Sequence, residues 1–312
     1  RCDQKCPVGI ELSPIRMIQR RGGAAENDIR NIYKGYFRRR QNVAAEKANG
    51  YPAYNFLPEP DPEKVDVLFF PGFMTHLTPS IKNSMVKILD ASGVNYSFID
   101  ELGGVCCGRP LMLAGQDKEA RELINFNSQM IWKSGAHTLV TSCPICYKVF
   151  KESYYLDVEV LHHTQFIKRM IDEGTIKMNF LRKKVVYHSP CDLGRGSGIY
   201  DEPKEVLKHV SRLEKTRFED ENSLCCGGSL ANMKISQHER NKIAYDAAAE
   251  LTMGNPDILA TACPLCKKTF SAATGTRVAD ISEIVSEALM KPPVKKNISK
   301  QVNTIKELVN IP

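Results

Sequence analysis

The sequence predicts an α/β protein with two tandem homologous lobes, and two observations support this prediction. Short apolar runs alternate with amphipathic stretches of helical period, which is the pattern of strands and the helices that cover them. A segment also recurs about 120 residues further along: Val140–Phe150 matches Ala260–Phe270, and Cys106-Cys107-Gly108 matches Cys225-Cys226-Gly227. Chance does not produce a self-match at one offset, so the chain contains two copies of one unit.

The composition fits a folded chain of two domains. At roughly 150 residues per domain, 312 residues with 42% apolar content supply two cores, which excludes a disordered or collagen-like chain. No run approaches the ~20 consecutive apolar residues of a membrane-spanning helix. The net charge of +7 suits an acidic partner without requiring one. Basic residues are not interleaved with an aromatic platform, so we expect no nucleic-acid partner.

The first residues carry a cysteine pair of their own. Cys2 and Cys6 are followed by Pro7, and this spacing ends the cluster motif of bacterial ferredoxins. We therefore expect residues 1–45 to be the C-terminal part of a ferredoxin-like helical iron–sulfur domain whose other cysteines precede Arg1; two free thiols are the alternative. The charged start is not a signal peptide, because no apolar stretch follows it.

The remaining elements follow in chain order. Residues 46–64 contain four prolines and read as a linker. The first lobe is expected over 65–180, the second over 181–290, and a basic tail over 291–312, either a helix that docks on a partner or a solvated tail. In the first lobe the apolar pattern predicts strands at Val65–Phe70, Val94–Ile99 and Thr138–Thr141, and helices at Ser80–Leu89 and Asp117–Trp132.

Five cysteines of the second lobe form the main candidate site. They are Cys191, Cys225, Cys226, Cys263 and Cys266. Adjacent cysteines face one pocket only from an irregular turn, and Gly227-Gly228 supplies the backbone freedom for it. Pro264 suits a loop entering a helix, where free N–H groups favour thiolates or an anionic cluster. Zinc needs only four ligands, so five soft thiolates favour iron–sulfur chemistry.

The first lobe has an incomplete copy of this set. Its four cysteines are Cys106, Cys107, Cys143 and Cys146, and Phe73 stands where the second lobe has Cys191. Phenylalanine cannot ligate a metal, so four thiols remain. A [4Fe-4S] cluster, zinc and no metal are the alternatives here. His76 is a weaker candidate for a substitute ligand.

The repeated Cys-Cys-Gly motif, preceded by Cys-x3-Cys-Pro, resembles the heterodisulfide reductase family, above all the domain of its B-type subunit and its fused D-type subunit. The K-type subunit of the sulfite-reduction complex and the C-type subunit of anaerobic glycerol-3-phosphate dehydrogenase are similar. The resemblance covers residues 1–7 and 65–285. It implies a non-cubane [4Fe-4S] cluster on the five second-lobe cysteines, where a disulfide is cleaved or formed, and [4Fe-4S] clusters in the ferredoxin-like part. The departure at Phe73 implies a relay or structural role for the first lobe.

Several basic residues near the motif are candidates for supporting roles. His188, three residues before Cys191, is expected to supply a proton to a leaving thiolate, and Arg195 to offset the charge of the cluster or attract an anionic substrate. Lys267 and Lys268 are candidates for the same task as Arg195. An ordinary surface or capping role is the alternative for each of these residues.

For two further motifs we expect a structural role and no part in the chemistry of the site. His162-His163 lies outside the sequence match between the copies, and we expect a loop or helix-start pair. The glycine-rich Gly194–Gly198 lacks the ending of a phosphate loop, so we expect a flexible loop beside the cluster.

Taken with the resemblance, these features predict an iron–sulfur oxidoreductase subunit acting on a thiol or disulfide. Its expected partners are other subunits of a redox complex, of flavin, iron–sulfur or membrane-cytochrome type. The expected location is the cytoplasm or, through partner subunits, the face of the inner membrane. A non-catalytic relay between a flavin dehydrogenase and a quinone or membrane carrier is one alternative, and a zinc-bound structural module is another.

Overall fold

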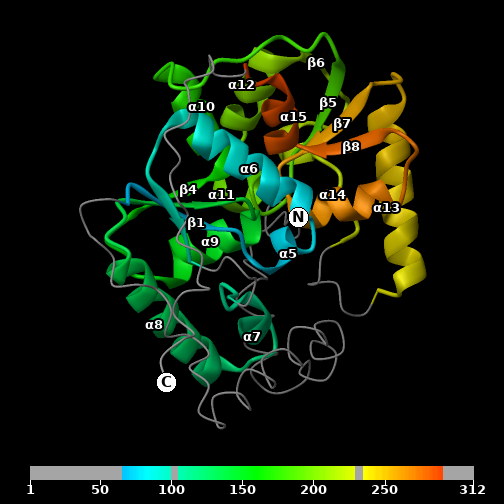
Figure 1. Ribbon diagram of the computed structural model, residues 1–312. Helices are drawn as coiled ribbons and strands as arrows, with labels where there is room; N and C mark the ends of the chain where they lie inside the picture. The colour runs from blue at the N-terminus through cyan, green and yellow to red at the C-terminus, as the bar shows by residue number, and fades with distance from the viewer. Residues whose placement is uncertain (1–64, 100–104, 229–234, 291–312) are drawn as a thin grey trace, which may run out of the picture.

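The computed structural model describes residues 65–99, 105–228 and 235–290. The predictions for Cys2, Cys6 and the rest of 1–45, for the linker at 46–64 and for the tail at 291–312 lie outside these residues. The described chain forms two lobes, each built on a four-stranded parallel sheet with helices packed on it (Figure 1). The predicted α/β class is confirmed.

The two sheets have the same strand order, as two copies of one unit require. The first runs β2-β1-β3-β4 and the second β6-β5-β7-β8, and every pairing is parallel. β1 and β7 are buried along their whole length, because helices cover both faces of such a sheet. The strands are β1 (Val67–Phe70), β2 (Tyr96–Phe98), β3 (Thr138–Thr141), β4 (Glu159–His162), β5 (Lys184–His188), β6 (Arg212–Glu214), β7 (Ile258–Thr261) and β8 (Arg277–Asp280).

The helices begin and end where sequence signals place them. The second helix of the first lobe, α6 (Pro79–Ser92), has proline in its first turn and ends at Gly93 with a φ of 71°. The predicted apolar side of this helix is buried. The other first-lobe helices are α5 (Phe73–His76), α7 (Arg109–Leu113), α8 (Asp117–Lys133), α9 (Pro144–Ser153) and α10 (His163–Asp172).

The second lobe repeats this arrangement with one difference from expectation. The glycine-rich segment after Cys191 forms a short helix, α11 (Gly194–Ser197), in place of the expected flexible loop. The remaining helical segments of this lobe are α12 (Asp201–Val210), a 3-10 turn at Asp220–Asn222, α13 (Gln237–Thr252), α14 (Pro264–Ser271) and α15 (Ile281–Ala288).

The lobes pack through equivalent helices. α6 contacts α15 and α10 contacts α12, so each lobe presents the same two elements to the other (Figure 1). Lys267 on α14 donates to Ser80 at the start of α6 at 2.7 Å and pairs with Glu283. Gln165 on α10 reaches Glu202 on α12 at 3.1 Å. These cross-lobe contacts fix the two cysteine sites relative to each other.

The histidine pair belongs to the repeat, contrary to the expectation that it lies outside. His162 ends β4 and caps α10, as Asp280 ends β8 and caps α15, and both caps form a capping box. The predicted role as a helix start is therefore confirmed. His163 Nε2 lies 3.1 Å from Asp280 Oδ1, with both side chains fully buried, so the pair also joins the two lobes.

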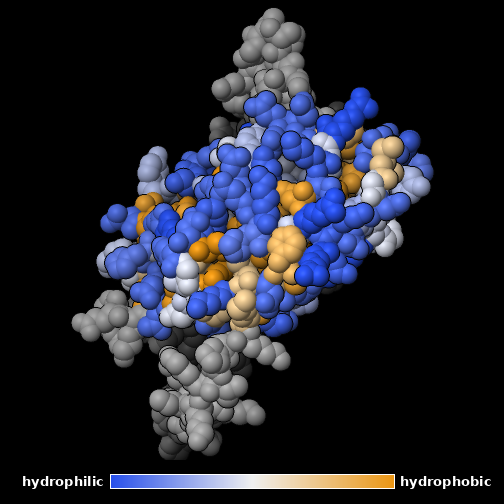
Figure 2. All heavy atoms as spheres, turned by 90° about the horizontal axis from the view of Figure 1, so that it is seen from above, coloured by the Kyte–Doolittle hydropathy of each residue, from blue (hydrophilic) through white to orange (hydrophobic). Residues whose placement is uncertain are grey.

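The surface is largely hydrophilic on the face seen in Figure 2, where apolar residues form several small groups. Most large apolar side chains of the described residues lie in the cores of the two lobes. Among the described residues, no helix combines the length and the apolar character needed to cross a bilayer.

Candidate metal centres

The cysteines of the second lobe come together at the carboxyl edge of its sheet. Parallel strands end at the same edge, so the segments after β5 and β7 meet there. Cys191 follows β5, and Cys263 follows β7 as the N-cap of α14, with Cys266 in the first turn of that helix. A segment without regular secondary structure brings Cys225 and Cys226 to the same place. The irregular turn and the proline-led helix start are confirmed.

The Cys-Cys-Gly turn directs backbone N–H groups at its own sulfurs. The amide of Gly227 donates to Cys225 Sγ and that of Gly228 to Cys226 Sγ, both at 3.4 Å. Gly227 has a φ of 76°, and a Cβ there would lie 2.4 Å from the carbonyl oxygen of Arg240. Only glycine fits this position, because both the conformation and the space exclude a side chain.

The thiols of this turn and of α14 interact directly. Cys266 Sγ donates to Cys226 Sγ at 3.2 Å. This hydrogen bond lowers the pKa of the Cys226 thiol, because it stabilises the thiolate, and it raises the pKa of Cys266. Donated N–H groups and a thiolate-prone sulfur are the chemistry that a metal–thiolate site needs.

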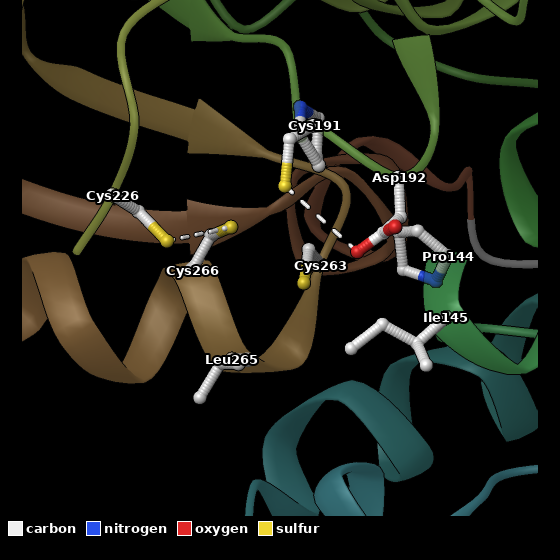
Figure 3. Close-up of a pocket in the computed structure, with 9 residues that line it drawn as sticks. Pro144, Ile145, Cys191, Asp192, Cys226, Cys263, Leu265 and Cys266 are labelled. Carbon is white, nitrogen blue, oxygen red and sulfur yellow. Dashed lines mark hydrogen bonds between the residues drawn. The ribbon is translucent and has the colours of Figure 1, made fainter. Parts of the chain in front are cut away.

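A pocket with an empty volume of about 330 Å³ opens onto these sulfurs (Figure 3). Four of the five cysteines line it: Cys191, Cys226, Cys263 and Cys266. The other lining residues are Pro190, Asp192 and Leu265 of the second lobe and Pro144 and Ile145 of the first. Both lobes therefore shape the space in front of the second-lobe thiols.

Cys191 is the member of the set that the first lobe lacks, and it is only partly buried. Its Sγ lies 3.8 Å from Asp192 Oδ2, as Figure 3 shows. Burial, followed by the negative charge of Asp192, raises the pKa of the Cys191 thiol. In the absence of a metal this sulfur is therefore a protonated thiol that faces the pocket.

His188, expected as a proton donor, is fixed behind the cysteine turn. Its Nε2 lies 3.0 Å from the carbonyl oxygen of Leu224 and its Nδ1 lies 3.2 Å from Thr261 Oγ1. A carbonyl only accepts, so Nε2 carries the proton and Nδ1 accepts from the hydroxyl. The ring is 1% exposed, and burial lowers its pKa to about 4. Because Leu224 precedes the paired cysteines, these contacts favour a positioning role over proton transfer.

Arg195 contacts the same segment from the other side. Its guanidinium donates to the carbonyl oxygens of Ser223 at 2.8 Å and Glu221 at 3.2 Å. Ser223 Oγ in turn donates to the carbonyl oxygen of Ser189 at 2.9 Å. Lys267 is engaged in the cross-lobe contacts, and Lys268 is exposed on α14. Arg195 thus contacts the backbone before the paired cysteines, in a position to hold it.

The first-lobe cysteines also gather, and sequence reasoning missed the two residues that support them. Tyr154 Oη donates to the carbonyl oxygen of Cys107 at 3.0 Å, and Asn127 Nδ2 donates to that of Cys106 at 2.9 Å. Asn127 Nδ2 also lies 2.8 Å from Tyr154 Oη. Both side chains are buried. Neither belongs to a motif, so the sequence carries no signal for them.

Where the second lobe has Cys191, the backbone of the first lobe passes close to one of its own thiols. Phe73 begins α5, and the preceding Gly72 has a φ of 74°. A Cβ at Gly72 would lie 2.9 Å from Cys146 Sγ, so glycine allows the backbone to approach this sulfur. His76 ends α5.

The number and placement of the cysteine thiols determine which kind of metal centre they could hold. Among the described residues, no three Cys, His, Asp or Glu side chains are placed around a single metal ion. A tetrahedral zinc site takes four ligands. A polynuclear cluster distributes its thiolates over several irons, and the five cysteines of the second lobe are a donor set of that kind. Within the described part of the chain, His76 belongs to no such group with the first-lobe thiols.

Comparison with known proteins points to the same chemistry. The family model CCG, described as a cysteine-rich domain, matches residues 67–151 and 185–271. The D-type subunit of dihydromethanophenazine:CoB–CoM heterodisulfide reductase from Methanosarcina barkeri is 30% identical, over 73% of this chain and 60% of its own. An EtfAB:quinone oxidoreductase from Syntrophomonas wolfei is 25% identical, over 92% of this chain and 45% of its own. The B-type subunit of the fumarate reductase (CoM/CoB) of Methanothermobacter marburgensis is 29% identical, over 64% of this chain and 40% of its own. The chain therefore matches 60% or less of the length of each of these relatives.

Proposed function

The chain belongs to the CCG cysteine-rich domain family, and on this premise we propose that it is an iron–sulfur oxidoreductase subunit of a heterodisulfide-reductase-like complex. The reaction breaks one S–S bond with two electrons and two protons and yields two thiols, or runs in reverse. One observation carries the proposal: four of the five second-lobe cysteines line a pocket to which both lobes contribute residues.

The donor set fits a non-cubane [4Fe-4S] cluster, held by the five second-lobe cysteines, Cys191, Cys225, Cys226, Cys263 and Cys266. When bound, this cluster supplies one-electron transfer and iron that can bind sulfur. Four cysteines saturate an ordinary cubane, so a fifth thiol is what distinguishes this lobe. The amides that donate to Cys225 and Cys226 favour thiolate ligands there.

His188 and Arg195 act on this site through the backbone. We assign both as positioning residues, because their side chains bond the carbonyl groups of Leu224, Ser223 and Glu221, directly before the paired cysteines. This assignment replaces the proton donation expected of His188. A neutral imidazole with both nitrogens engaged has no proton available for a leaving thiolate.

The first lobe receives a different role. Its four thiols, Cys106, Cys107, Cys143 and Cys146, suit a [4Fe-4S] cluster without a position for substrate, since Phe73 supplies no fifth thiolate. Asn127 and Tyr154 orient the paired cysteines of this lobe through their carbonyl groups. Cys2 and Cys6 are proposed as ligands of a further [4Fe-4S] cluster in the ferredoxin-like part.

The partners are proposed to be other subunits of a redox complex, because two of the relatives are named as subunits. Nine cysteines of the described residues are free thiols, which supports a reducing compartment such as the cytoplasm. A second candidate function is electron relay to a quinone. It is favoured by the relative named EtfAB:quinone oxidoreductase, which matches 92% of this chain.

Anaerobic electron paramagnetic resonance of the oxidised protein, with and without added thiol, tests the proposal. We expect a signal that appears or shifts with thiol, is lost in Cys225→Ser, and persists in Cys106→Ser, the equivalent change in the first lobe. Iron present with signals indifferent to thiol would favour the relay. A thiol-dependent signal that is lost only in Cys106→Ser would refute the assignment of the second lobe as the substrate site.

A further inference from the structure

We propose that Lys148 of the first lobe is a positioning residue for Cys191, the fifth cysteine of the second-lobe site. This inference rests on the proposed function and concerns the same site. The first lobe lacks the equivalent of Cys191, because Phe73 stands in its place. A side chain that holds Cys191 therefore supports the feature by which the proposed substrate site differs from an ordinary cluster site.

Lys148 reaches the second lobe from α9, the helix that begins at the first-lobe Cys-Pro-x-Cys motif. Its Nζ donates to the carbonyl oxygen of Gly196 on α11 at 2.8 Å. A Cβ at Gly196 would lie 3.5 Å from Lys148 Cδ, so the aliphatic stem of the lysine also lies against this residue. Glu152, one turn further along α9, pairs with Lys148 and helps to orient it. The lysine side chain is 24% exposed, so this charge-assisted hydrogen bond is partly shielded from water.

The residue that Lys148 holds is bonded directly to Cys191. The amide of Gly196 donates to the carbonyl oxygen of Cys191 at 2.8 Å, and a Cβ at Gly196 would lie 3.3 Å from that oxygen. Ser197 Oγ donates to the carbonyl oxygen of Asp192 at 2.8 Å. These bonds close a short turn between Cys191 and α11, so a shift of Gly196 moves the backbone of Cys191 with it. Lys148 thus acts on the fifth cysteine through one intervening residue.

The helix that carries Lys148 also borders the pocket that Cys191 faces. Pro144 and Ile145, in the first turn of α9, line this pocket together with Cys191 (Figure 3). Leu265, the counterpart of Ile145 in the repeat, lines it from the first turn of α14. Lys148 lies one turn after Pro144 on α9. Because one helix both lines the pocket and holds the turn of Cys191, the place of the fifth thiol relative to the pocket wall is set across the lobe interface.

Cys191 depends on such a contact more than the other cysteines of its site do. Two of these belong to α14, and the adjacent pair follows a segment that His188 and Arg195 hold through its carbonyl groups. Cys191 is only partly buried and lies in the turn after β5. The contact from Lys148 therefore adds to this turn a support that the second lobe does not provide.

The second lobe makes the reciprocal contact on the first. Lys267 on α14 donates to Ser80 Oγ at 2.7 Å, and Ser80 lies in the segment after Phe73, as Gly196 lies in the segment after Cys191. Each lobe thus uses a lysine on the helix of its Cys-Pro-x-Cys motif to hold the other lobe. Of these two lysines, only Lys148 holds a segment that carries a cysteine.

The test measures the dissociation constant for 2-mercaptoethanol on the anaerobically prepared protein, from the thiol-induced change in its paramagnetic resonance signal. Iron and acid-labile sulfide are counted in the same samples. Lys148→Met removes the N–H donor and keeps most of the aliphatic stem. We expect this variant to keep the wild-type iron and sulfide content and to bind the thiol roughly three- to tenfold more weakly, which is the effect of one lost hydrogen bond.

Two further variants make the result specific. Lys148→Arg keeps the charge and an N–H donor and should retain most of the wild-type affinity. Lys151→Met, at an exposed lysine of the same helix, should leave the affinity unchanged. Unchanged affinity in Lys148→Met, an equal loss of affinity in Lys148→Arg or Lys151→Met, or a loss of iron in Lys148→Met would overturn the inference and leave the proposed function intact. A wild-type signal indifferent to the thiol would instead refute the proposed function, and the inference with it.

Discussion

Buried His188 links the stability of the second lobe to pH. The imidazole is 1% exposed and bonded as the neutral form, and burial lowers its pKa to about 4. In the unfolded chain its pKa returns to about 6.5. Between these two values the unfolded state binds more protons than the folded state. The free energy of unfolding contributed by His188 is therefore fully present above about pH 6.5 and is lost as the pH falls toward 4.

The size of this effect follows from the two pKa values. At ~1.36 kcal/mol per unit, the full loss is about 3 kcal/mol, and roughly 1 kcal/mol of it falls between pH 7.5 and 5.5. His188→Gln should remove this part of the pH dependence, because glutamine offers an N–H to the carbonyl of Leu224 but does not titrate.

Urea unfolding followed by circular dichroism under anaerobic conditions, at pH 7.5 and at pH 5.5, measures the effect. His209→Gln is the matched control, since His209 is exposed on α12, and it should keep the wild-type pH dependence. Equal pH dependence in His188→Gln and the wild-type protein would show that His188 is not held neutral in the folded state, and the positioning role assigned to it would fail.

Two further predictions concern the supports of the paired cysteines. Tyr154→Phe removes the buried hydroxyl that donates to the carbonyl oxygen of Cys107, so the free energy of unfolding in urea should fall by roughly 1–3 kcal/mol. The control is Tyr155→Phe, which changes a fully exposed side chain and should alter the free energy of unfolding little. Gly227→Ala places a Cβ 2.4 Å from the carbonyl oxygen of Arg240 at a positive φ, so we expect a loss of ~4 irons per chain in a colorimetric assay. Gly254→Ala, with no atom within 4 Å of its Cβ, should keep the wild-type iron content.

The fold could be predicted because its signals are local and occur twice. The apolar runs that became β1 and β3 and the proline at the start of α9 and α14 are visible in the sequence, and the repeat shows that both lobes share one strand order. The repeated cysteine motif, the glycines after Cys226 and the proline after Cys263 were also visible in the sequence, and they predicted the irregular turn and the helix start that carry the thiols.

What could not be predicted depends on tertiary contacts. Asn127 and Tyr154 lie far from their cysteines in sequence and meet them only after α8 and α9 pack, so no spacing reveals them. Sequence proximity of His188 and Arg195 to Cys191 does not show that their side chains contact the backbone carbonyl groups of Leu224 and Ser223. The place of the histidine pair in the repeat was missed because its counterpart in the second lobe is Asp280, a residue of different chemistry with the same capping role.

The central claim, that both lobes hold iron–sulfur clusters and that substrate acts at the second, is tested most directly by metal analysis of single-lobe variants. Iron, acid-labile sulfide and zinc are to be counted in the anaerobically purified wild-type protein, in Cys226→Ser and in Cys107→Ser. We expect iron and sulfide without zinc, and a loss of ~4 irons per chain in each variant, with the response to thiol lost only in Cys226→Ser. Zinc without iron in the wild-type protein would contradict the account.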